Sequence, residues 1–162
     1  MSISRQQILD FLYREARLLD DREWDEWLTC YDPEATFWMP AWTDEDELTT
    51  DPHSQISLIY YPNREGLEDR VFRIKTERSS ATMPETRTTH NITNMEVLAQ
   101  REGEVDIRFN WHTLAPRYNN VSSNFGTSFY TLKEENGELT ILSKKVVLKN
   151  DYVHQVIDVY HI

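Results

Sequence analysis

Apolar positions near the start of the chain follow the period of an α-helix. Apolar side chains recur at helical intervals over residues 5–19, with polar side chains between them. Ser4 and Gln7 have the spacing of a capping box, in which each side chain satisfies a backbone N–H of the first turn. The pattern therefore predicts an amphipathic helix over residues 5–19 that packs one face on a core.

A second helical pattern follows Asp20 and Asp21, either of which has the chemistry of a helix N-cap. Asp32-Pro33 is predicted to end this helix, since proline is poorly tolerated in a helix interior. The aromatic spacing is more typical of a helix lying on a sheet than of a ligand site. The predicted apolar face consists of Trp24, Trp27, Leu28 and Tyr31.

The middle of the chain predicts two short strands and a third helix. Residues 37–42 are predicted to form a strand, but successive apolar positions in it would emerge on both faces of a sheet. We expect another chain to cover one of those faces, with Trp38 and Trp42 in the contact. A second strand is predicted over residues 57–61, and apolar residues at helical spacing predict a helix over residues 64–75.

From Thr86 onward the apolar pattern changes to period two, which is typical of strands with one face on a core. Residues 101–104 are predicted to turn one strand into the next. Asn-Gly within residues 135–138 predicts a tight hairpin, because these two residues readily adopt positive φ angles. The last two strands are predicted at residues 139–148 and 152–160.

Helices followed by strands predict an α+β domain, in which a curved, mostly antiparallel sheet packs on the N-terminal helices. The chain has only four glycines, so strands have few places to bend sharply. We therefore expect a cone-like sheet curved by β-bulges rather than a closed barrel. A length of 162 residues fits a single domain over residues 1–162.

Composition and charge narrow the classes of function. A net charge of −11 argues against nucleic acid as a partner, because binding to phosphates needs a basic surface. No apolar run is long enough to cross a membrane or to act as a signal peptide, so a cytoplasmic location is expected. The single cysteine, Cys30, suits a reducing compartment and is predicted to be a buried, inert thiol.

The histidines and acidic residues show no pattern of a metal site. None of the histidines His53, His90, His112, His154 and His161 pairs with another at helical spacing, and no zinc motif is present. A Rieske cluster is excluded, because it requires two cysteines as well as two histidines. Carboxylates in residues 43–50 lack the spacing of a calcium loop and predict a solvated loop.

His90 is a candidate general base. Paired with an acid such as Asp69 or Asp106 inside a cone-shaped sheet, it would have a pKa that burial can tune. The alternative, which we favour, is that His90 only hydrogen-bonds to neighbouring strands.

Arginines surround a predicted loop over residues 77–84 and are the other candidate functional residues. Their planar guanidinium groups are suited to bidentate pairing with carboxylates of a partner chain. Ion pairs on the surface of this acidic protein are an equally simple explanation. The arginines are Arg70, Arg73, Arg78 and Arg87.

The same region carries a resemblance to a known family. The sequence DRVFRIKTERSSATMPETRTTHNITNMEV, from Asp69 to Val97, resembles the signature of small (beta) subunits of aromatic-ring-hydroxylating dioxygenases. The likeness continues in EARLLDDREWDEWLTCYDPEATFWMPAW, in FNWHTL and in KKVVLKNDYVHQVIDVYHI, and covers essentially the whole chain. Within the family, these segments look like the benzoate and toluate 1,2-dioxygenase type.

The resemblance implies a cystatin-like α+β fold of the NTF2-like group and a noncatalytic subunit of an α3β3 hexamer. It implies that the alpha subunit carries a Rieske 2Fe-2S cluster and mononuclear Fe(II), and that a reductase passes electrons from NADH. The whole enzyme would add both atoms of O2 to an aromatic carboxylate and give a cis-dihydrodiol. No catalytic, cofactor-binding or metal-binding residue is implied in this chain. Trp38, Trp42 and the four arginines are expected at subunit interfaces.

Two other classes of function remain open on the sequence alone. The related fold also suits a freestanding isomerase, dehydratase or cyclase that uses the cone interior, with His90 as its base. A regulatory or ligand-binding module would be stabilised by its ligand without turnover.

Overall fold

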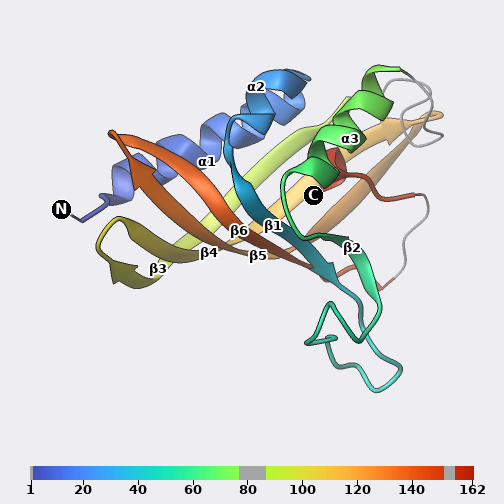
Figure 1. Cartoon of the computed structure of the whole chain (residues 1–162). Helices are drawn as coiled ribbons and strands as arrows, with labels where there is room; N and C mark the ends of the chain where they lie inside the picture. Colours follow the sequence, from blue (N-terminus) through green and yellow to red (C-terminus); the bar gives the residue numbers. More distant parts are fainter. Residues whose placement is uncertain (1, 77–86, 152–155) are drawn as a thin grey trace.

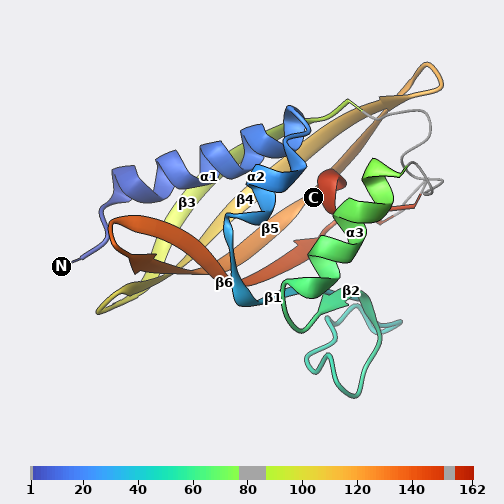
Figure 2. The ribbon, with the colours of Figure 1, turned by 45° about the horizontal axis from the view of Figure 1, so that its top comes forward.

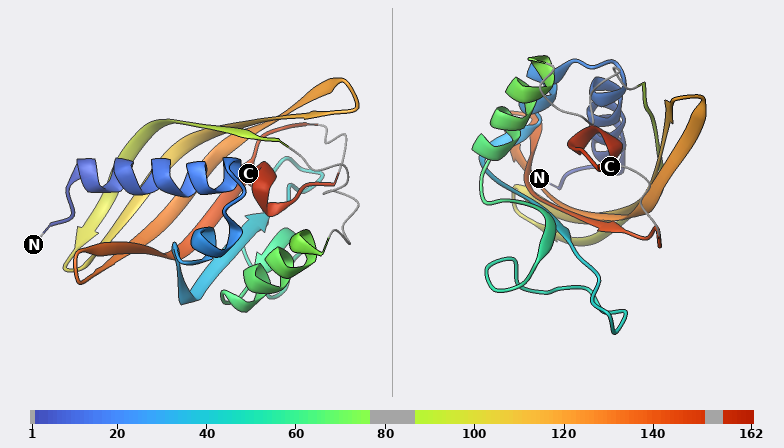
Figure 3. Two further views of the ribbon diagram at one scale, coloured as in Figure 1. Left: turned by 90° about the horizontal axis from the view of Figure 1, so that it is seen from above. Right: turned by 90° about the vertical axis from the view of Figure 1, so that its right-hand side faces the viewer.

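A six-stranded sheet curls around the N-terminal helix and encloses most of the core (Figures 1 and 3). The computed structural model describes residues 2–76, 87–151 and 156–162. No helix within these ranges is long and apolar enough to cross a membrane. The elements are α1 (Arg5–Asp20), α2 (Trp24–Leu28), β1 (Tyr31–Pro40), β2 (Ser57–Tyr61), α3 (Glu65–Lys75), β3 (Thr89–Arg101), β4 (Glu104–Arg117), β5 (Asn120–Glu135), β6 (Glu138–Leu148) and the 3-10 helix η1 (Val159–His161).

The strand order is β2-β1-β6-β5-β4-β3, and every neighbouring pair is antiparallel except β1 and β6, which are parallel. Register shifts interrupt four of the five strand pairings, and Asn94 in β3 has a φ of 57°. Such bulges increase the local twist and bend a sheet. The expected cone-like curvature by bulges, without closure into a barrel, is therefore confirmed.

Helix α1 lies on the concave side of the sheet, and Figure 2 shows it running along β3 and β4. The capping box is formed: Ser4 Oγ accepts from the backbone N–H of Gln7, and Gln7 Oε1 accepts from that of Ser4. The predicted helix over residues 5–19 is confirmed. The predicted helix over residues 64–75 also corresponds closely to α3.

The chain reversals that glycine and asparagine predicted are present. In the β5–β6 hairpin, Asn136 and Gly137 have φ angles of 54° and 81°, as a tight hairpin turn requires. The β3–β4 turn uses Gly103 at a φ of 75°.

The prediction for the second helix was wrong in its extent. Helix α2 ends at Leu28, and Tyr31 is the first residue of β1, with Asp32 and Pro33 inside that strand. Asp20 and Asp21 do not cap α2, because they are the last residue and the C-cap of α1. Tyr31 stands at helical spacing from Trp24, Trp27 and Leu28, but in the structure it is the first inward-facing residue of a strand. Burial and pairing with β6 favour the extended form there.

The predicted strand over residues 152–160 was also wrong where the structure can be compared. Residues 152–155 lie outside the described residues, and Val159–His161 form a 3-10 helix. Asp158 caps this helix by accepting from the backbone N–H of Val159. The short helix is buried inside the cone (Figure 3), so its apolar residues pack on the core without being paired in the sheet.

Candidate functional site

The outer face of the sheet carries one side chain from each strand in a continuous row. Trp38 pairs with Lys145, Lys145 with Phe129, and Phe129 with Arg108 in the cross-strand register. Tyr60 of β2 and Glu96 of β3 extend the row to both edges of the sheet. We call Tyr60, Trp38, Lys145, Phe129, Arg108 and Glu96 the outer row.

Cations and aromatic rings alternate in the centre of the outer row. The Lys145 ammonium lies 5.1 Å from the Trp38 ring centroid and 5.6 Å from that of Phe129. On the other side of Phe129, the Arg108 guanidinium carbon lies 5.2 Å from the ring centroid. These four side chains are half-buried, and the cation–π contacts hold them in fixed positions before any partner binds. Tryptophan and arginine in an ordered surface patch are typical of protein–protein interfaces.

The two tryptophans that the sequence indicated have different surroundings. Trp38 belongs to the outer row, and its indole N–H donates to Ser57 Oγ over 2.9 Å. Trp42 follows β1 and is 42% exposed, although its indole N–H donates to the Leu148 carbonyl over 2.6 Å. Both indole nitrogens are therefore satisfied within the chain. Lys145 lies over the Trp38 ring, whereas Trp42 exposes a larger part of its ring for contact with another chain.

The four arginines have separate environments. Arg70 of α3 forms an ion pair with buried Asp158, in which Nε donates to Oδ1 over 2.7 Å. It joins α3 to the C-terminal segment. Arg73 and Arg87 are exposed, and Arg87 lines a shallow groove beside β4. Arg78 lies outside the described residues.

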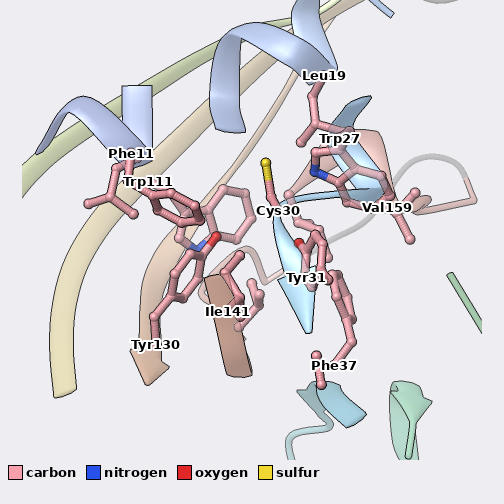
Figure 4. Close-up of a cluster of buried hydrophobic side chains, with 14 of the residues drawn as sticks. Phe11, Leu19, Trp27, Cys30, Tyr31, Phe37, Trp111, Tyr130, Ile141 and Val159 are labelled. Carbon is pink, nitrogen blue, oxygen red and sulfur yellow. The ribbon is translucent and has the colours of Figure 1, made fainter. Parts of the chain in front are cut away.

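A buried carboxylate that was not predicted from the sequence occupies the interior. Glu15 of α1 accepts hydrogen bonds from Tyr130 Oη at 2.6 Å, Trp27 Nε1 at 3.0 Å and Tyr31 Oη at 3.1 Å. The Lys144 ammonium lies 3.4 Å from the same carboxylate. Figure 4 shows the three aromatic partners in the core. Glu15 stands at helical spacing within the apolar stripe of α1, and this position is the feature of the sequence from which its burial could have been predicted.

Electrostatics favour the ionised form of Glu15 and the protonated forms of the two tyrosines around it. Burial raises the pKa of Glu15, but Lys144 and the three hydrogen bonds outweigh it and hold the pKa below its ordinary value. Burial and the neighbouring carboxylate raise the pKa values of Tyr31 and Tyr130 well above normal, so both hydroxyls stay protonated and donate. Burial lowers the pKa of Lys144, and Glu15 opposes that change.

His90 faces the interior from β3 and pairs with Asp20 at the end of α1. Its Nδ1 lies 2.5 Å from Asp20 Oδ1, and its backbone N–H donates to the other carboxylate oxygen over 3.1 Å. The suggested acids were wrong: Asp69 is exposed on α3, and Asp106 pairs with Arg101. Burial raises the pKa of Asp20, but the hydrogen bonds from His90 and Thr88 outweigh burial and hold the pKa below its ordinary value.

No group of three or more metal-ligating side chains occurs among the residues that the structure describes. His53 is exposed beside Tyr60, and His112 contacts Ser123 on the outer face of β4. His154 lies outside the described residues. Cys30 is buried between α2 and β1, and burial raises the pKa of its thiol to about 12. The prediction of a buried thiol is therefore confirmed.

His161 makes the stability of the fold sensitive to acid. Burial lowers its pKa to about 4, although Asp158 opposes the change. Between that value and the ordinary 6.5, the unfolded chain binds a proton that the folded chain does not. We expect the free energy of unfolding to fall by about 2 kcal/mol from pH 7 to pH 5. Urea unfolding at both pH values measures it.

The matched variant for this prediction is His161→Asn. The asparagine oxygen can accept from the backbone N–H of Asp158 as Nδ1 of His161 does, but it does not titrate. From pH 7 to pH 5, the free energy of unfolding of the variant should fall by about 2 kcal/mol less than that of the native chain. Equal losses in the two proteins would assign the acid sensitivity to other groups.

The sheet curled over an N-terminal helix, with an ordered outer face, defines an NTF2-like α+β cone. The putative scytalone dehydratase from Novosphingobium aromaticivorans has this fold, with a TM-score of 0.66 at 13% identity over 93% of this chain and 89% of that chain. At that identity the likeness shows the fold alone.

Comparisons of sequence are more specific. The family of ring-hydroxylating beta subunits matches residues 14–155. The beta subunit of toluate 1,2-dioxygenase from Pseudomonas putida is 63% identical over 162 residues, all of both chains. The crystal structure of the benzoate 1,2-dioxygenase beta subunit from Burkholderia mallei has a TM-score of 0.85 at 56% identity, covering 100% of this chain and 99% of that one.

This chain belongs to the family of ring-hydroxylating beta subunits. It is therefore a structural subunit of an aromatic-ring-hydroxylating dioxygenase complex, and its partner is an alpha subunit. The resemblance seen in the sequence and the expected NTF2-like fold are both confirmed.

Proposed function

We propose that the complex dihydroxylates an aromatic carboxylate of the benzoate or toluate type to a cis-dihydrodiol, and that this chain is its noncatalytic subunit. The observation that carries the proposal is the 63% identity, over the whole chain, to a toluate 1,2-dioxygenase beta subunit. The freestanding isomerase, dehydratase or cyclase is not favoured, because the likeness to a dehydratase is one of fold only.

We propose that the redox groups lie on the alpha subunit, as a Rieske 2Fe-2S cluster and mononuclear Fe(II), with NADH supplying electrons through a reductase. The residues of this chain do not fit a Rieske cluster, because Cys30 is the single cysteine and two are needed. We further propose an α3β3 hexamer in the cytoplasm, to which this chain contributes one domain, residues 1–162.

We propose that the outer row and Trp42 contact other subunits of that hexamer, with Arg73 and Arg87 as further contacts. Arg78 belongs to the same proposal, whereas the ion pair of Arg70 with Asp158 gives Arg70 a role inside the chain. Half-buried Lys145, which lies between the Trp38 and Phe129 rings, and half-buried Arg108, which lies over Phe129, suit contact with carboxylates of a partner chain. Their positive charge stands out on a protein with a net charge of −11. It therefore favours a specific contact with acidic groups of a partner over attraction by the protein as a whole.

The test is co-purification from the native host with a tag on this chain. We expect a larger iron-sulfur polypeptide in near-equal amount, a native mass that fits the hexamer, and conversion of benzoate or a toluate when the reductase and NADH are added. An iron-free monomer or dimer that purifies alone would contradict the proposal. If the complex converted an aromatic compound that has no carboxylate but did not convert benzoate or toluate, the proposed substrate class would be wrong.

A further inference from the structure

Four buried side-chain atoms have no hydrogen-bond partner among the residues that the structure describes, and all belong to one region of the cone. They are His90 Nε2, Trp111 Nε1, Thr113 Oγ1 and His161 Nε2. His90 of β3 is the cross-strand partner of Thr113 in β4, and Trp111 faces inward two positions before Thr113. His161 of η1 is close enough for a charge on His90 to lower its pKa. Unsatisfied polar atoms are rare in native proteins, so a cavity beside two of them, His90 Nε2 and Trp111 Nε1, indicates a bound molecule.

His90 and Trp111 line the same partly enclosed cavity, together with Glu15, Tyr130 and Lys144. The cavity measures about 20 Å³. A cavity of roughly 10–15 Å³ or more holds one water molecule, whereas an aromatic ring needs several times that space. The size therefore selects water.

The hydrogen-bonding chemistry of the two side chains is complementary. His90 Nδ1 lies 2.5 Å from the Asp20 carboxylate, which only accepts hydrogen bonds when ionised, so Nδ1 carries the proton. Nε2 accepts a hydrogen bond in the neutral ring and donates one in the imidazolium. The Trp111 indole N–H is a donor. A molecule between them must accept from Trp111 and must either donate to Nε2 or accept from it, and a water molecule can do each of these.

We propose that the interior of the cone has a specific water-binding site between His90 and Trp111. The bound water satisfies the indole N–H and Nε2 of the Asp20–His90 pair, and it links β3, β4 and the end of α1 through hydrogen bonds. A buried water of this kind is part of the fold and is costly to remove. The inference does not depend on the substrate or stoichiometry of the oxygenase.

The first test is a crystal structure of the full chain at a resolution that shows ordered water. We expect density within hydrogen-bond distance of both His90 Nε2 and Trp111 Nε1. A dry cavity, or direct pairing of either atom with a protein group, would overturn the proposal.

The second test uses ¹⁵N-labelled protein in solution. We expect ¹⁵N shifts that place the His90 proton on Nδ1, and a nuclear Overhauser effect between the Trp111 indole proton and a long-lived water. The variant His90→Asn keeps a donor for Asp20 but removes Nε2 and its hydrogen bond to the water, so the water signal should be lost. The control His112→Asn, on the outer face, should leave the signal unchanged. A water signal that survives His90→Asn, or is lost equally in His112→Asn, would contradict the site.

Discussion

Replacing Glu15 by alanine should destabilise the chain by about 3–5 kcal/mol, because it leaves the Lys144 ammonium buried without its counter-charge. The two side chains are only 4% and 3% exposed, so water cannot replace the lost carboxylate without opening the core. The hydroxyls of Tyr31 and Tyr130 would lose their acceptor as well. Urea unfolding followed by circular dichroism measures the change.

The pH dependence of the same variant is a second signature. The pKa of Lys144 lies below its ordinary value in the folded chain, so the unfolded chain binds more protons at alkaline pH. The stability of Glu15→Ala should therefore rise as the pH increases and Lys144 loses its charge. The double variant Glu15→Leu, Lys144→Met is the control, because it removes both charges and should regain much of the loss. A loss below about 1 kcal/mol that does not vary with pH would contradict a buried ion pair.

Truncating both Trp38 and Trp42 to alanine should dissociate the oligomer. A central aromatic residue of an interface commonly contributes at least about 2 kcal/mol, which corresponds to roughly 30-fold in the dissociation constant. Two such losses would release this chain at working concentrations, lower the native mass and reduce the hydroxylation rate. Size-exclusion chromatography with light scattering and an assay of substrate consumption measure both effects.

Two comparisons separate an interface from a general loss of stability. Trp38 is half-buried within its own chain, so the unfolding midpoint of the isolated double variant must be measured beside its native mass. Tyr13→Ala removes an aromatic ring that is 52% exposed on α1, away from the outer row. An unchanged native mass and rate in the double variant, or equal dissociation by Tyr13→Ala, would show that the interface is elsewhere.

Sequence patterns were sufficient to predict the elements that depend on neighbouring residues alone. The capping box of Ser4 and Gln7, the amphipathic period of α1 and α3, and the Asn136-Gly137 turn all depend on residues a few positions apart. The family resemblance was equally visible in the sequence, since it depends on residue identities along the whole chain. These features were enough to predict the fold class and the membership in an oxygenase complex.

Contacts between distant segments decided the rest. Tyr31 was predicted in a helix, but pairing of β1 with β6 and burial against Glu15 place it in a strand. Asp20 pairs with His90, and Lys144 with Glu15, because the curled sheet brings strands from the second half of the chain over α1. The outer row likewise exists only in the register of six strands. The sequence by itself determined the local elements and the family, whereas the tertiary structure decided which charges are buried together, because burial and strand register depend on the whole fold.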